Sequence, residues 1–156
     1  MTAAEQSYVR HADFERDGDA YVATATQFDA TVTVDEDAHH VRVTVPMLDA
    51  VVVGETVAPV VEEGWYETFE LRLEDVSGVL RTDDVSEPTV TRDGDAAVVE
   101  ATFEADGRAA AEEAMALVNY VEGTWFEGVI PGYEYVEEIQ AMRERAHQNA
   151  GDPTSP

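Results

Sequence analysis

Residues 28–46 read FDATVTVDEDAHHVRVTVP, two alternating apolar runs on either side of an acidic turn. Apolar residues at every second position share one face of a strand and leave the intervening polar residues on the other face. Asp35–Ala38 supplies the turn, and Pro46 ends the second run because proline has no backbone N–H for a sheet. The stretch therefore predicts a β-hairpin with one buried face.

The segments around this hairpin extend the pattern in both directions. A capping box of Thr2 and Glu5 opens a predicted helix that ends near residue 12, and residues 21–26 are predicted to form a further strand. From Pro59 onward, apolar residues recur every three or four positions, which predicts an amphipathic helix over 59–77.

A second hairpin follows over residues 89–103, with Asp93-Gly94 at its turn. A helix capped by Asp106 is predicted next, ending at Glu122 or continuing toward Phe126, and a last helix covers 133–147. The order α-β-β-β-α-β-β-α-α predicts an α+β fold, an antiparallel sheet with helices packed on one face. The pentapeptide RDGDA occurs twice, at 16–20 and 92–96, which we interpret as the same turn used twice.

The chain is strongly acidic, with 34 Asp and Glu against nine Arg and no Lys, and its 156 residues carry a formal net charge of −25. Self-repulsion of this size destabilises a compact state, whereas molar salt shortens the screening length to about 3 Å. Disorder is the alternative, but a hydrophobic content of 44% in periodic runs favours a folded protein. We therefore expect a halophilic protein with one domain at 1–148 and a disordered polar tail at 149–156.

The composition also limits partners and location. An acidic surface lacks the basic stripe that binds phosphates, so we expect no nucleic-acid partner. No apolar run approaches the ~20 residues that cross a bilayer, and residues 1–10 lack the apolar core of a secretion signal. We expect no membrane partner and a cytoplasmic location.

Several enzyme classes are excluded by missing residues. Without Lys there is no phosphate-binding P-loop lysine and no Schiff-base nucleophile, and without Cys there is no thiol catalysis. Neither a Gly-x-Ser-x-Gly elbow nor a Gly-x-Gly-x-x-Gly loop occurs. We expect no cofactor. The remaining possibilities are an enzyme that uses carboxylates and histidines, or a protein without catalytic activity.

His39, His40 and Asp37 form the candidate metal site, since imidazole and carboxylate are ligands for zinc and manganese. Adjacent strand residues point to opposite faces, however, which hinders both histidines from holding one ion. A solvated hairpin tip is the alternative interpretation.

The segment 120–135, YVEGTWFEGVIPGYEY, combines large aromatic residues with glycines and one proline. This composition is typical of a binding groove or a dimer contact, although the same rings could complete the core. With two aromatic residues of the long helix, the candidate partner-binding residues are Trp65, Tyr66, Tyr120, Trp125, Phe126, Tyr133 and Tyr135.

Three strings carry a family resemblance: FERDGD at 14–19, VAPVVEEGW at 57–65 and IPGYEY at 130–135. Together they resemble a family of haloarchaeal proteins of unknown function, over about residues 7–147. The resemblance implies a lineage and a single domain, and it assigns no activity or catalytic residue.

Two hypotheses follow. The first is a non-enzymatic interaction module that binds a protein partner or forms a homodimer. The second is a small metal- or carboxylate-dependent enzyme that uses the acidic turn at His39 and His40.

Overall fold

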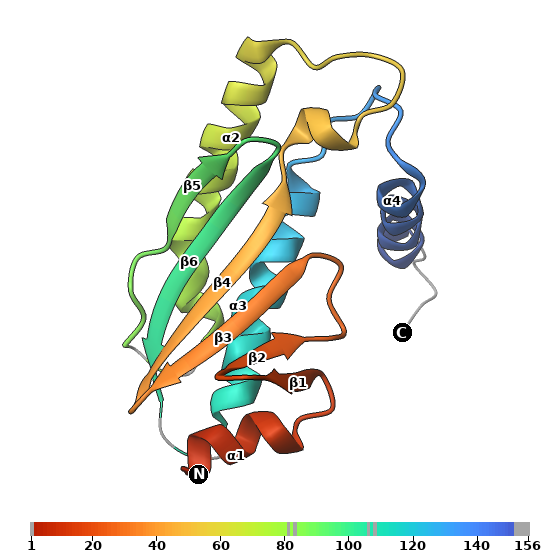
Figure 1. The fold of residues 1–156 in the computed structure, drawn as a ribbon. Coiled ribbons are helices and arrows are strands. Elements are labelled where there is room, and N and C mark those ends of the chain that lie inside the picture. Colours follow the sequence, from red (N-terminus) through yellow and green to blue (C-terminus); the bar gives the residue numbers. More distant parts are fainter. Residues whose placement is uncertain (1, 81, 83, 106, 108, 152–156) are drawn as a thin grey trace.

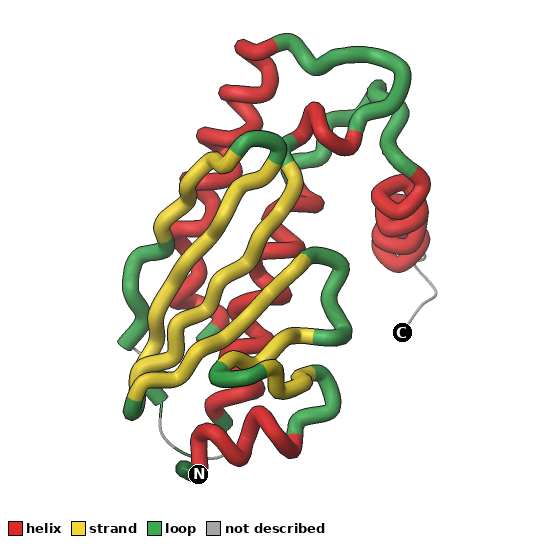
Figure 2. The backbone as a smooth tube through the Cα atoms, viewed as in Figure 1, coloured by secondary structure: helices red, strands yellow, loops and turns green. Residues whose placement is uncertain are grey.

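The computed structural model describes residues 2–80, 82, 84–105, 107 and 109–151, with side chains as far as residue 145 in the last helix. Six strands form one antiparallel sheet in the order β1-β2-β3-β4-β6-β5 (Figures 1 and 2). Their bounds are β1 Phe14–Asp17, β2 Ala20–Ala23, β3 Asp29–Asp35, β4 Ala38–Pro46, β5 Thr89–Asp93 and β6 Ala96–Glu104. The predicted α+β class with an antiparallel sheet is confirmed.

The helices are α1 Ala3–Arg10, α2 Pro59–Leu73, α3 Ala110–Glu127 and α4 Glu137–Gly151, with 3₁₀ turns η1 Leu48–Val51 and η2 Glu74–Val79. Figure 1 looks onto the sheet, with α2 and α3 behind it, α1 at its lower end and α4 to the side. Within the described residues, no helix covers the face toward the viewer. We call this face the open face.

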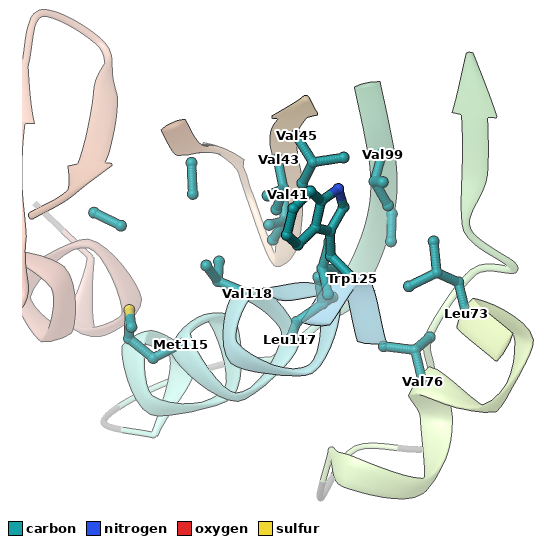
Figure 3. Close-up of a cluster of buried hydrophobic side chains, with 14 of the residues drawn as sticks. Val41, Val43, Val45, Leu73, Val76, Val99, Met115, Leu117, Val118 and Trp125 are labelled. Carbon is teal, nitrogen blue, oxygen red and sulfur yellow. The ribbon is translucent and has the colours of Figure 1, made fainter. Parts of the chain in front are cut away.

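The core lies between the sheet and α3. Alternate residues of β4, among them Val41, Val43 and Val45, are fully buried on the helix side. Figure 3 shows them around the ring of Trp125, with Leu117 and other side chains of α3 close by. The indole Nε1 of Trp125 donates a hydrogen bond to the carbonyl of Pro46 over 2.9 Å, which satisfies its polar atom inside the core.

The repeated pentapeptide forms the same hairpin turn in both places. Gly18 and Gly94 stand first in their two-residue loops with φ of +63° and +60°, a conformation that costs glycine little. Arg16 Nε donates to the carbonyl of Gly18, and Arg92 Nε donates to that of Gly94. The two residues of each loop are therefore Gly and Asp, one position later than the predicted Asp-Gly turn. Three strands were predicted before the long helix, and the structure has a fourth, β1.

Three helix boundaries differ from the sequence prediction. Helix α1 ends at Arg10 and not near residue 12, and α2 ends at Leu73 and continues as η2. Of the two alternatives for α3, the structure has the longer one, which runs through Gly123 to Glu127. Helix α4 begins only at Glu137, because the residues before it pair with the segment after β4 through an antiparallel bridge of Val52 and Tyr135.

Two further predictions concern residues that the structure describes only in part or not at all. Helix α4 includes residues 149–151 of the predicted tail, and 152–156 lie outside the described residues. The predicted cap Asp106 lies outside them too.

Candidate functional site

Three of the seven aromatic candidates lie in the core. Trp125 is fully buried, and Trp65 and Tyr135 are 4% and 3% exposed. The ring of Trp125 meets Trp65 edge-on at 6.2 Å between centroids and Phe28 at 5.0 Å. These rings hold α2, α3 and the β2–β3 loop together.

The other four candidates are half-buried and do not converge. The Tyr120 hydroxyl donates to the carbonyl of Arg72 over 2.7 Å, and Phe126 stacks on Phe28 at 6.4 Å. Tyr66 lines a pocket of about 460 Å³ beside Arg92. Tyr133 lines a separate groove of about 760 Å³ along α4, together with Tyr135. The aromatic segment therefore forms no single binding surface.

Trp65 has one polar atom without a partner. Its buried Nε1 makes no hydrogen bond. A Cβ placed on Gly128, at the end of α3, would lie 3.1 Å from this nitrogen. Gly128 is therefore the residue that lets the indole of α2 lie against the end of α3.

The structure places His39 and His40 on opposite faces of β4. His39 is fully buried on the helix side, and His40 is exposed on the open face, where its Nδ1 lies 2.9 Å from the Thr102 hydroxyl. Asp37 is exposed in the turn. No group of three or more His, Asp or Glu able to hold a metal ion occurs among the residues that the structure describes.

His39 is held by two hydrogen bonds in the core. Its Nε2 lies 2.8 Å from the Ala105 carbonyl, which can only accept, so Nε2 carries the proton. Its Nδ1 then accepts from the Tyr8 hydroxyl, also at 2.8 Å. Burial lowers the pKa of His39, against smaller opposing effects of the Ala105 bond and of Asp37 and Glu113. His39 is therefore a neutral residue that fastens α1 to the sheet.

Several carboxylates also have structural roles. Each accepts hydrogen bonds from backbone N–H groups of a loop, and we call these contacts carboxylate clips. Asp49 accepts from the N–H of Val57 (2.7 Å), and Glu62 accepts from that of Asp49 (2.8 Å). Glu113 accepts from the N–H of Thr82 (2.8 Å). Glu122 accepts from the N–H groups of Gln27 (2.9 Å) and Phe28 (2.8 Å). Glu62 also pairs with Arg92 at 2.9 Å, which ties β5 to α2. Burial raises the pKa of Glu122, and its two N–H bonds oppose that shift.

The open face is arranged in three rows that cross the strands. The middle row runs Val22, Thr31, Arg42, Glu100, Thr89 in register, flanked by rows of Thr33, His40, Thr102 and of Thr44, Val98, Thr91. We call these eleven residues the neutral centre. Arg42 contributes +1 and Glu100 −1, so the neutral centre carries no net charge in a chain whose formal charge is −25.

Carboxylates surround the neutral centre at the strand ends and at the β1 edge. They are Glu15, Asp17, Asp29, Asp35, Asp93 and Glu104. Within the centre, Arg42 Nε lies 3.9 Å from Glu100 Oε1, and the two side chains are 59% and 60% exposed. Sequence reasoning did not identify this surface, although the alternation in 28–46 already places Thr31, Thr33, Arg42 and Thr44 on one side of the predicted hairpin.

In the part of the chain that is described, no helix is both long enough and apolar enough to span a bilayer. A comparison with curated proteins found no match. The family model DUF5813, described as a family of unknown function, matches residues 9–145. This match covers most of the chain and includes all three strings on which the resemblance rests. The chain therefore belongs to this family of unknown function.

Proposed function

We propose that this protein is a non-enzymatic cytoplasmic interaction module, adapted to high salt, which binds a protein partner through its open face. The observation that carries the proposal is the neutral centre. A surface whose only role is to hold water and salt ions would carry carboxylates there as it does elsewhere on this chain. Charge is instead depleted from the middle of the face and kept at its rim.

Centres depleted of charge inside polar rims are typical of protein–protein interfaces, where desolvating charge is costly. The charges within this centre are the opposed pair Arg42 and Glu100. Threonine suits such a surface, because its β-branched side chain fits the pleated sheet and offers both a methyl group and a hydroxyl. The face also rests on the rigid sheet, so little conformational entropy is lost on binding.

The experiment introduces charge into the neutral centre. Thr33 and Thr91 are exposed and lie on β3 and β5, so the double change Thr33→Glu with Thr91→Glu adds two carboxylates without touching the core. The matched control is Thr68→Glu, the same substitution at an exposed position of α2. Circular dichroism in molar KCl checks that each variant is folded.

We expect tagged wild-type protein and Thr68→Glu to retain the same bound protein after in-cell crosslinking at native salt. The double variant should lose it, because unpaired charge is then desolvated at the centre of the interface. A folded double variant that retains every crosslinked protein would refute binding through this face.

A further inference from the structure

We propose that the protein bound at the open face is a second copy of this chain, packed face to face about a two-fold axis. This inference rests on the proposed function, because it names the partner of the same surface. Two features of the neutral centre favour a second copy, its charge balance and the position of Arg42 and Glu100, and the area of the overlap predicts how tightly the copies associate.

The first feature is charge. Two copies each carry a formal charge of −25, so most of their surfaces repel one another. At the neutral centre the two surfaces meet without net charge, and the rim carboxylates remain at the edge, where water and cations reach them. Molar salt, with its screening length of about 3 Å, removes most of the remaining repulsion.

The second feature is self-complementarity. Arg42 and Glu100 lie directly opposite each other on β4 and β6, in the middle row of the face. Their contact within one chain is long, 3.9 Å, and both side chains are more than half exposed. In a two-fold interface each residue of a pair meets the other residue of the second copy. An axis near this pair therefore brings Arg42 of each copy to Glu100 of the other.

The area of the overlap follows from the same axis. An axis between β4 and β6 lays β4 on β6 and β3 on β5 of the other copy, so the faces overlap over four strands, about 19 by 23 Å or roughly 440 Å². Two such faces bury about 900 Å², below the range of about 1,200–2,000 Å² for stable interfaces, which predicts a weak and reversible dimer. Twisted sheets pack in this way at about 10 Å separation, with their strands about 30° apart.

The test is the molar mass in solution, measured by sedimentation velocity and light scattering over a wide range of protein concentration in molar KCl. We expect a reversible monomer–dimer equilibrium for the wild-type protein, with more dimer at high protein concentration and weaker association as KCl is lowered toward the limit of folding. Arg42→Glu places four carboxylates at the axis, and Glu100→Arg places four guanidinium groups there. Each single change should weaken dimerisation at least ~tenfold.

The double change Arg42→Glu with Glu100→Arg restores opposite charges across the axis and should recover the dimer. Thr68→Glu on α2 is the control that should leave it unchanged. A wild-type monomer at every concentration, or a dimer that withstands both single changes, would overturn the inference.

The two proposals fail in different ways. If the wild type is a monomer but Thr33→Glu with Thr91→Glu still removes a crosslinked protein of another sequence, the second copy is wrong and the binding face stands. If the wild type is a monomer and the double variant retains every crosslinked protein, both are wrong.

Discussion

At the scale of single residues, His39 shows how a chemically versatile side chain can serve packing. It shares the buried side of β4 with Val41 and Val43, and both ring nitrogens are used by Tyr8 and Ala105. Its stacking on Phe103 at 4.8 Å completes the contact. Protonation would put a second N–H where the Tyr8 hydroxyl now donates, inside an apolar environment, so the fold favours the neutral ring.

This arrangement predicts a pH dependence of stability. The folded-state pKa of His39 lies below the ordinary value of 6.5, so its contribution to stability is fully present above that pH. As the pH falls from about 7 to 5, His39 takes up a proton in the unfolded chain but stays neutral in the folded chain. The free energy of unfolding therefore decreases.

Chemical denaturation in molar KCl across this pH range measures the effect. His39→Gln should be less stable than wild type at pH 7 by about 1–3 kcal/mol, because one buried partner is left unsatisfied. Its stability should also vary less with pH. An equal slope in the wild-type protein and in His39→Gln would contradict the assignment to His39.

At the scale of elements, Gly123 inside helix α3 and Gly128 at its C-cap have different roles. Gly123 lies in the helix with no atom within 4 Å of a would-be Cβ, whereas the same atom on Gly128 would lie 3.1 Å from Trp65 Nε1 and 3.5 Å from the Trp125 carbonyl. The φ of Gly128 is −84°, so contact and not backbone conformation requires glycine there.

The prediction is a pair of opposite effects on thermal stability. Gly123→Ala should stabilise the protein by about 0.5–1 kcal/mol, because alanine is the better helix former. Gly128→Ala should destabilise it by about 1–3 kcal/mol, because the methyl group overpacks against the indole. Calorimetry in molar KCl measures both changes. If Gly128→Ala also stabilised the protein, the Trp65 ring would be shown to move aside at no cost, and the packing argument would be wrong.

Alternation within 28–46 was enough to predict the central hairpin, since β3 and β4 have the expected buried side. The same alternation puts His39 on the side of the strand that Val41 occupies, which is the buried side. The interpretation of His39 as part of a solvated hairpin tip did not take this into account. Strand β1 was missed because it is only four residues long and its last two, Arg16 and Asp17, belong to the predicted turn. Trp125 could not be assigned from sequence, because rings of a core and rings of an interface share one composition.

At the scale of the whole molecule, charge and topology have to be considered together. The neutral centre joins residues of β3 to residues about 70 positions away on β6, and only the strand order brings them together. The amino-acid composition therefore indicates that the chain is acidic, but it does not show that the middle of the open face carries no net charge.

The acidity of the whole chain predicts a fold that depends on salt. As KCl is dialysed away, repulsion among the carboxylates should reduce the far-UV helical signal, and restoring KCl should recover it. Circular dichroism along a KCl series measures the change. A helical signal that stays constant down to millimolar salt would argue against a halophilic protein.

The carboxylate clips have a consequence for how such a chain can evolve. A carboxylate that is held by a lysine or an arginine depends on that side chain, so losing basic residues loosens such a contact. The counterparts of Asp49 and Glu122 are main-chain amides, which every non-proline residue supplies whatever its side chain. The anchoring of these two loops is therefore independent of basic residues, whereas the Glu62 clip, which also pairs with Arg92, keeps that dependence.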